Sequence, residues 1–229
     1  MAYWLKMAFD AREPSFEFED EPEKMRLFGL SLGIPVGTER LPTKAREITE
    51  KKVYPDIMTM PGLNAVSAKF KQIVEEFEPE LHQFFPLRLT RKDGSLVEDE
   101  YFIFNCTVSF DSLLFQHSEV DWIYSESKNK CPWLEIKDFR VNALSKPAIQ
   151  GRHIWSNFRL RCPGIYISDA FHRQLKDEKI RYCESFFCEE LDIPWVASEN
   201  VQPILDWEKK HGLERGMKPW LLQHQDELK

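Results

Sequence analysis

Two stretches of the chain follow the same plan, and this repetition constrains the fold more than any other feature. The first reads MPGLNAVSAKFKQIVEEFEPELHQFFPL from residue 60, and the second reads CPGIYISDAFHRQLKDEKIRYCESFF from residue 162. Each contains a Pro-Gly turn, an extended segment, a serine, an amphipathic segment and a Phe-Phe pair. A chain that builds the same unit twice is expected to pack the two copies around one core.

The first stretch predicts a capped helix followed by a strand. Ser67 is a good N-cap, because its hydroxyl accepts a bond from a backbone N–H that the helix leaves unpaired. Four apolar side chains then recur at helical spacing and form one face: Phe70, Ile73, Val74 and Phe77. Pro79 is expected to end the helix, and residues 82–90 read as a strand.

The second stretch predicts the same order of elements. Ser168 is its cap, Asp169 is placed favourably in the first turn, and Phe171 and Leu175 share a face. Residues 183–191 read as the following strand. The likeness could also be a coincidence, because capped helices before strands are common. We therefore predict an α+β fold: a mostly antiparallel sheet with two similar helix–strand units packed on it.

The rest of the chain supplies further strands and one helix. Lys92-Asp93-Gly94-Ser95 is a turn signal. It precedes a strand over 101–110, which we expect to be antiparallel to 82–90. Residues 33–62 carry three Gly and four Pro, and we interpret them as mostly loop. Strands are also predicted over 2–9, 15–20 and 153–162, and a helix from Asn200 to His211.

Composition excludes several classes of function. The net charge is −7, which argues against a general nucleic-acid binder, because such proteins gather Lys and Arg to displace counterions from phosphates. Anionic membranes are disfavoured for the same reason, and no apolar stretch is long enough to span a bilayer. The N-terminal segment MAYWLKMAFDA does not fit a signal peptide, so we expect a cytoplasmic protein.

The chemical groups form no convincing active site. The five cysteines include no C-x-x-C pair, which favours free thiols, and no His or Cys spacing matches a metal site. Ser125 and Lys128 fit S-x-x-K by letter only. His117 lies near Glu119 and Asp121, so an acid–base pair there, or a site using His153, is the basis of an enzyme alternative. We expect no catalytic residues, no cofactor and no metal.

The order of the pieces resembles a known bacterial family. It begins with PDIMTMPGLNAVSAKFKQIVEEF, continues through HQFFPLRL, DGS, YFIFNC and VDWIYSES, and ends with PGIYISDAF. This pattern is similar to the myxobacterial-type immunity proteins of polymorphic toxin systems, formerly a domain of unknown function. The resemblance covers roughly residues 55–190. We expect residues 1–229 to form one immunity-type domain, with strands and loop in 1–54 and a helix and tail in 191–229.

What the resemblance implies is binding to a toxin, and not catalysis by this chain, in the cytoplasm of the producing cell. The toxin would be encoded by an adjacent gene, and an acidic inhibitor suits a basic target. The first candidate surface is an acidic strand region comprising Glu17, Glu19, Asp20, Glu21 and Glu23. The second consists of Asp121, Trp122 and Glu126, with Trp122 as an anchor. The alternatives are an effector-loading adaptor or chaperone and an enzyme of unknown class, and a homodimer stays open.

Overall fold

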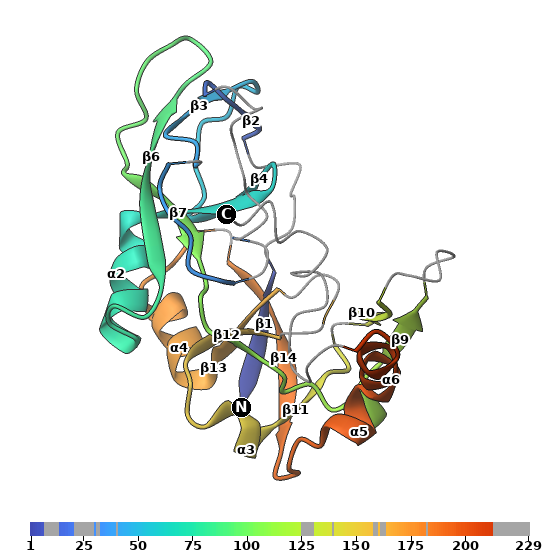
Figure 1. The fold of residues 1–229 in the computed structure, drawn as a ribbon. Coiled ribbons are helices and arrows are strands. Elements are labelled where there is room, and N and C mark those ends of the chain that lie inside the picture. The colour runs from blue at the N-terminus through green and yellow to red at the C-terminus, as the bar shows by residue number, and fades with distance from the viewer. Residues whose placement is uncertain are drawn as a thin grey trace.

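Two curled sheets and a pair of adjacent helices make up most of the protein (Figure 1). The computed structural model describes residues 1–6, 14–20, 30, 33–39, 41–124, 131–138, 140–157, 160, 164–181 and 183–212. Most strand pairs are antiparallel, and helices α2 and α4 pack against each other. The predicted α+β fold with two similar helix–strand units is confirmed.

The first unit is built from consecutive parts of the chain. Its strands lie in the order β3-β6-β7-β5-β4, and β2 (Phe16–Phe18) adds an outer strand beside β3. Strand β3 is parallel to β6, and the other pairs of the unit are antiparallel. Its elements are β3 (Lys44–Glu47), β4 (Ile57–Met60), β5 (Leu63–Ser67), α2 (Ala68–Phe77), β6 (Gln83–Thr90) and β7 (Tyr101–Asn105).

The second unit has the same strand order and directions, but it takes one strand from the start of the chain. Its order is β11-β14-β1-β13-β12, with β11 parallel to β14 and the other pairs antiparallel. Strand β8 (Ser109–Phe110) lies outside β12. Its elements are β11 (Ala143–Ser145), β12 (Ile154–Asn157), β13 (Ile165–Ser168), α4 (Asp169–Asp177), β14 (Glu184–Leu191) and β1 (Ala2–Lys6). Strand β1 therefore occupies the place that β7 holds in the first unit.

The equivalence of the units extends to single residues. Ser67 and Ser168 both cap a helix with φ −71° and ψ 161°. The Ala68 N–H donates to the Glu100 carbonyl at 3.0 Å, and the Asp169 N–H donates to the Met1 carbonyl at 2.8 Å. The strand registers align Phe85 with Phe186 and Phe84 with Ser185. The two copies thus run without a gap from cap to strand.

The helix faces meet in a core that both units share. Phe70 and Phe171 occupy equivalent positions, are fully buried and lie edge to face with ring centroids 6.1 Å apart. Their cluster also contains residues from β1, β4, β5, β12 and β13. The predicted apolar faces are confirmed, since Ile73, Val74 and Leu175 are buried as well.

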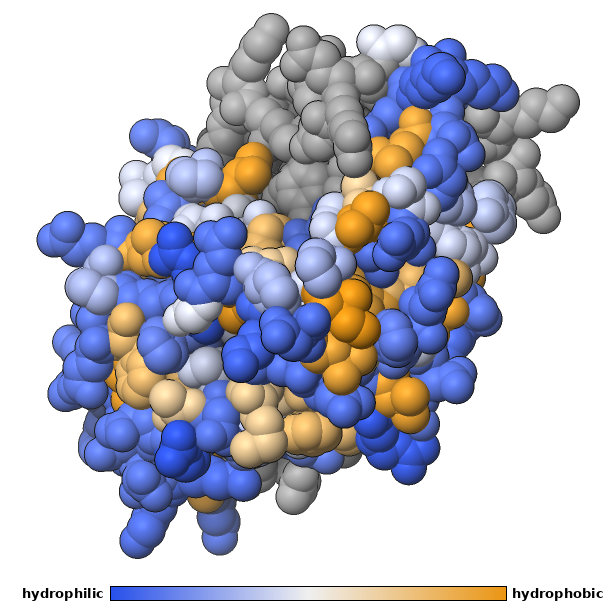
Figure 2. Space-filling view, turned by 90° about the horizontal axis from the view of Figure 1, so that it is seen from below, coloured by the Kyte–Doolittle hydropathy of each residue, from blue (hydrophilic) through white to orange (hydrophobic). Residues whose placement is uncertain are grey.

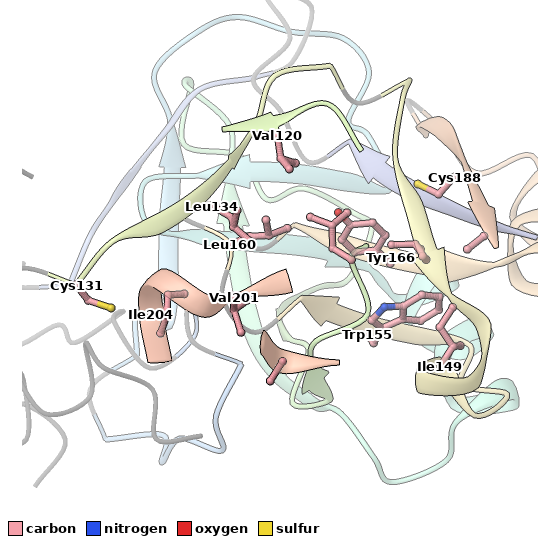
Figure 3. Close-up of a cluster of buried hydrophobic side chains, with 14 residues drawn as sticks. Val120, Cys131, Leu134, Ile149, Trp155, Leu160, Tyr166, Cys188, Val201 and Ile204 are labelled. Carbon is pink, nitrogen blue, oxygen red and sulfur yellow. The ribbon is translucent and has the colours of Figure 1, made fainter. Parts of the chain in front are cut away.

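A third group of elements packs against the second unit and forms a further core together with strands of that unit. It comprises η2 (Phe115–His117), β9 (Val120–Ile123), β10 (Trp133–Ile136), α3 (Lys146–Ile149), α5 (Ala197–Asn200) and α6 (Gln202–Lys210). Figure 3 shows Trp155 and Tyr166 at one end of this core and Val201 and Ile204 of the C-terminal helices at the other. The predicted C-terminal helix is confirmed, although it is divided at Val201 into α5 and α6.

The described part of the interval 33–62 is mostly loop, as predicted, but it also holds two short strands that were not predicted, β3 and β4. In β3 the apolar alternation is hidden, since the alternate inward positions are Ala45 and a buried Glu47. The predicted strand 101–110 is two strands, β7 and β8, that join different sheets. Within the predicted strand 153–162, the described strand is β12, Ile154–Asn157.

Candidate binding site at the junction of the two units

The acidic strand region is partly engaged in holding the fold. Asp20 Oδ2 accepts the backbone N–H groups of Thr43 at 2.6 Å and Lys44 at 3.2 Å, which fixes the start of β3. Glu19 lies 3.4 Å from the Arg46 guanidinium, and Glu17 is exposed on β2 opposite Arg46. Glu21 and Glu23 lie outside the described residues. The described part is therefore a mixed-charge edge and not a purely acidic face.

The second predicted surface is also only partly available. Asp121 is exposed, with Lys137 Nζ 3.7 Å from its carboxylate. Trp122 is half-buried, and its ring lies 5.9 Å from that of Phe115. Trp122 packs against the core of the third group of elements, so it is not a freely projecting anchor. Tyr124, one residue past β9, is 66% exposed. Glu126 lies outside the described residues, as do Ser125 and Lys128.

The histidines of the enzyme alternative do not come together. His117 is exposed at the end of η2. His153 Nδ1 lies 2.8 Å from Ser168 Oγ, and its ring packs against Phe77. Within the described ranges, no group of three or more His, Cys, Asp or Glu side chains is arranged to hold a metal ion.

Four cysteines are described as free thiols. Cys106, Cys131 and Cys188 are buried, whereas Cys183 is half-buried. Burial raises the pKa of Cys183 to about 11 and that of Cys188 to about 12. Both side chains therefore stay protonated near neutral pH and are poor nucleophiles. Cys162 lies outside the described residues.

The surface offers scattered apolar side chains. Figure 2 shows apolar patches separated by hydrophilic side chains on the face that it presents. The large apolar side chains that are most exposed come from different elements and loops: Met1, Ile48, Val53, Leu96, Tyr124, Val141, Phe187 and Val196. Among the described helices, none is long and apolar enough to cross a membrane.

A charged cleft lies where the start of α2 meets the end of α4. We call this junction the open seam and define it by Asp56, Lys69, Asp99, Glu178 and Arg181. The buried Asp56 carboxylate accepts from Arg181 Nε at 3.1 Å, from Arg181 Nη2 at 3.2 Å and from the Arg181 backbone N–H at 2.7 Å. Arg181 Nη2 also donates to Asp99 at 3.2 Å. Lys69 Nζ pairs with the Glu178 carboxylate at 3.3 Å and donates to its carbonyl.

The central ion pair of the open seam is fixed in its charged form. Burial raises the pKa of Asp56, but the hydrogen bonds from Arg181 and Ser67 outweigh it and hold the pKa below its usual range. The same bonds to Asp56 raise the pKa of the Arg181 guanidinium. Neither group exchanges a proton near neutral pH, so the pair is suited to recognition and not to acid–base chemistry.

Solvent reaches much of the open seam. Its cleft has a volume of about 460 Å³ and is lined by Asp56, Ser67, Ala68, Lys69, Asp99, Glu100, Lys179 and Arg181. A smaller hollow of about 150 Å³ shares Asp99 and Arg181 with it and adds Lys52, Val53, Tyr54, Arg91, Val97 and Glu98. The two hollows therefore adjoin at the Asp99–Arg181 contact.

The equivalent junction, where the end of α2 meets the start of α4, is filled. We call it the closed seam and define it by Phe77, Glu78, His82, His153 and Ser168. The Phe77 and His153 rings lie edge to face at 4.9 Å. Glu78 accepts from the His153 N–H at 2.8 Å and from His82 Nε2 at 2.9 Å. Glu78 and His82 are both buried.

Sequence reasoning missed the residues of the open seam. The available signal was the run of acids Glu98, Asp99 and Glu100 directly before a predicted strand. Their meeting with Arg181 depends on the packing of one unit against the other, which no local pattern reveals.

The comparison with known families gives a match over most of the chain. The model described as "Immunity protein family (Imm11)" matches residues 17–184. The matched region begins at the second residue of β2, contains β3 to β13 and the helices α2 to α4, and reaches the first residue of β14. It thus includes both cap serines and every residue that defines the two seams. No curated protein matches the chain.

Proposed function

The chain belongs to this immunity protein family, and from that premise we propose that it binds and neutralises one cognate toxin in the cytoplasm of the cell that makes both. The observation that carries the proposal is the open seam, a solvent-accessible charged cleft held by a duplicated scaffold whose two units share one core. An inhibitor needs such a preorganised surface, because rigid binding groups lose little entropy when the partner docks.

The proposed mode of action is occlusion by binding, without chemistry on the toxin. The ion pair at the centre of the open seam supports this, since its pKa values are driven away from neutrality. His117 and His153 support it too, because they lie in different surroundings and share no partner in the described contacts.

We further propose that the toxin is basic and is encoded by an adjacent gene. A net charge of −7 favours a cationic target and speeds its encounter with the inhibitor. Glu17, Glu19 and Asp121 stay proposed as outlying contacts that steer the approach. Residues 1–229 are proposed to act as one immunity-type domain, because the shared core draws side chains from both units.

The test is calorimetry between this protein and the purified product of the adjacent gene at low and high salt, with a growth assay in cells that produce that product. We expect tight binding that weakens with salt, together with protection of the cells. Binding without protection would indicate the adaptor or chaperone alternative. No binding to a folded neighbour would contradict the proposed function.

A further inference from the structure

An exposed aromatic side chain lies on the face of the second sheet that α4 covers only in part. Ser185 of β14 lies under α4, with its Oγ 2.8 Å from His172 Nε2. Side chains alternate along a strand, so Phe187, two residues on, lies on the same face. Phe187 is 47% exposed, although its ring meets that of Tyr3 edge to face at 5.9 Å. It therefore lies beyond the part of the sheet that α4 covers.

The neighbouring strands extend this aromatic side chain into a patch. Met1 directly precedes β1 and is 62% exposed, and the alternation of side chains places it on the same face as Tyr3. Val141 is 46% exposed and directly precedes Asn142, whose carbonyl accepts a backbone N–H of β14 at 2.9 Å. Isolated apolar side chains are common on protein surfaces, whereas a contiguous group indicates an interaction site. We call this group the apolar row and define it by Met1, Tyr3, Val141 and Phe187.

The equivalent positions in the first unit show that the fold does not require the apolar row. The register places Pro86 and Arg88 of β6 where β14 has Phe187 and Glu189. All four side chains are exposed. The same scaffold therefore carries a small ring and a cation in one copy, and a large aromatic ring and a carboxylate in the other. A difference at exposed positions of a duplicated fold is a property of the surface and not of folding.

We propose that the apolar row is a docking site for the toxin, with Phe187 as its anchor. This inference rests on the proposed function and adds a second contact to the open seam. The occupant is an apolar side chain of the toxin that packs on Phe187, with a cation of the toxin beside Glu189. A few large side chains that become buried near the centre of an interface carry most of its binding energy.

The size of a stable interface supports a contact larger than the open seam. Such an interface buries about 800 Å² on each partner, which is more surface than a cleft of about 460 Å³ presents. The chain leads directly from the open seam to the apolar row, because Arg181 lies three residues before β14. Phe187 follows Arg181 by six residues, which span at most about 20 Å. One partner can therefore cover both.

Only one of the two seams is available to such a partner. The seams are equivalent by register, and at the same interval from each cap serine the closed seam has Phe77 where the open seam has Glu178. Phe77 covers its neighbour His153, whereas Glu178 turns to Lys69 and remains 45% exposed. A partner that docks on the apolar row can therefore extend into the open seam, whereas the closed seam is filled.

The charges around the apolar row suit a basic partner. Residues 183–206 contain six carboxylates and no Lys, Arg or His. Several cations nearby are paired within the chain: Arg173 with Asp169, Arg140 with Asp138 and the Met1 amine with Glu190. Two exposed lysines lie toward the ends of β14, Lys176 near Cys183 and Lys146 directly after the strand partner of Leu191. Glu189 lies between these ends, two residues from Phe187, and has no ion-pair partner in the described part of the chain. Its carboxylate is free to attract a cation of the toxin.

The first test compares two exposed apolar side chains. Phe187→Ala removes the anchor, and Ile48→Ala is the control, since Ile48 is 48% exposed and lies in the first unit. Binding to the purified product of the adjacent gene is measured by calorimetry, and folding by thermal unfolding. We expect Phe187→Ala to bind at least about 30-fold more weakly, as for a central anchor. The control should change affinity less than about 3-fold, and both variants should unfold at nearly the parent's temperature.

The second test compares two substitutions that change the net charge equally. Glu189→Lys reverses the charge beside Phe187, and Glu76→Lys reverses an exposed charge on α2. Glu189→Lys should bind at least about 5-fold more weakly, because it places a cation against a basic partner. Glu76→Lys should change affinity less than about 2-fold, as expected for a charge outside the contact.

Several outcomes would overturn the proposal while the proposed function stands. One is that Phe187→Ala binds as tightly as Ile48→Ala. Another is that Glu189→Lys and Glu76→Lys lose equal affinity, because only a diffuse field would then act; this comparison also decides the matter if Phe187→Ala unfolds early. A third is that the parent sediments as a dimer and Phe187→Ala as a monomer, because a second copy would then cover the apolar row. If the parent itself does not bind, the proposed function fails and this inference fails with it.

Discussion

The open seam and the closed seam are the same junction built twice, and their difference separates scaffold from surface. In both, a cap serine starts a helix, and its N–H donates to the carbonyl of the residue directly before β4 or β12. In both, a charged side chain also ties one unit to the other. In the closed seam this tie is Glu78, which is buried under aromatic rings. In the open seam it is Arg181, whose side chain is 41% exposed. The backbone plan is thus independent of what the seam presents to solvent.

The largest expected effect tests whether the two units contribute equally to the core. Phe70→Asp and Phe171→Asp should each abolish cooperative folding, because each would bury a charge in the shared core. Phe70→Ala and Phe171→Ala should each lower the free energy of unfolding by about 3–5 kcal/mol. The double alanine variant should cost less than the sum, since the rings touch. Denaturant unfolding measures all of these, and a parent-like melt for either aspartate variant would disprove the core assignment.

A smaller effect should follow from exchanging the residues that distinguish the seams. Phe77→Glu should lower the free energy of unfolding by about 2–3 kcal/mol, because it removes ring contacts with His153 and Phe171 and places a carboxylate near the buried Glu78. Glu178→Phe, the reverse change in the open seam, should alter stability by less than about 0.5 kcal/mol, as is usual at an exposed position. Equal effects of the two substitutions would mean that the seams do not differ in packing.

Acid should weaken the fold partly through Asp56. In the folded protein the pKa of Asp56 lies below its ordinary value of 3.8. Its contribution to the free energy of unfolding is therefore complete above pH 3.8, and it is lost as the pH falls through the folded pKa. Asp56→Asn should lower the free energy of unfolding by about 1–2 kcal/mol at pH 7, since solvent reaches Arg181 and limits the loss. The variant should then lose less stability than the parent between pH 4 and pH 2. An unchanged acid slope in urea unfolding would contradict this role of Asp56.

The smallest effect concerns the caps, where the two units agree most closely. Ser67→Ala and Ser168→Ala should each cost about 1 kcal/mol, because each leaves a first-turn N–H without its hydroxyl acceptor. Thermal unfolding of the two variants should give the same shift. A clearly larger loss of stability for Ser67→Ala than for Ser168→Ala would contradict this. It would show that the bond between Ser67 and Asp56 stabilises the fold more than the contact between Ser168 and His153.

The repeated units were predictable because their signals are local. The cap serines, the apolar helix faces and the Phe-rich strands each lie within one short stretch, and the structure confirms them. Strand β3 was missed because charged side chains hide its period, and the role of β1 was missed because pairing with β13 and β14 is a long-range event. The open seam was missed for the same reason, as Asp56 and Arg181 come from different units.

The position of β1 has a consequence for how the protein is made. The first unit draws on residues 44–105 and can pair its strands while the rest of the chain is still being synthesised. Strand β1 is translated before its partners Ile165–Ser168 and Glu184–Leu191. It therefore stays without these partners until more than 160 further residues have been made. The shared core can become complete only after β13 and β14 have been translated and Leu5 of β1 has joined it.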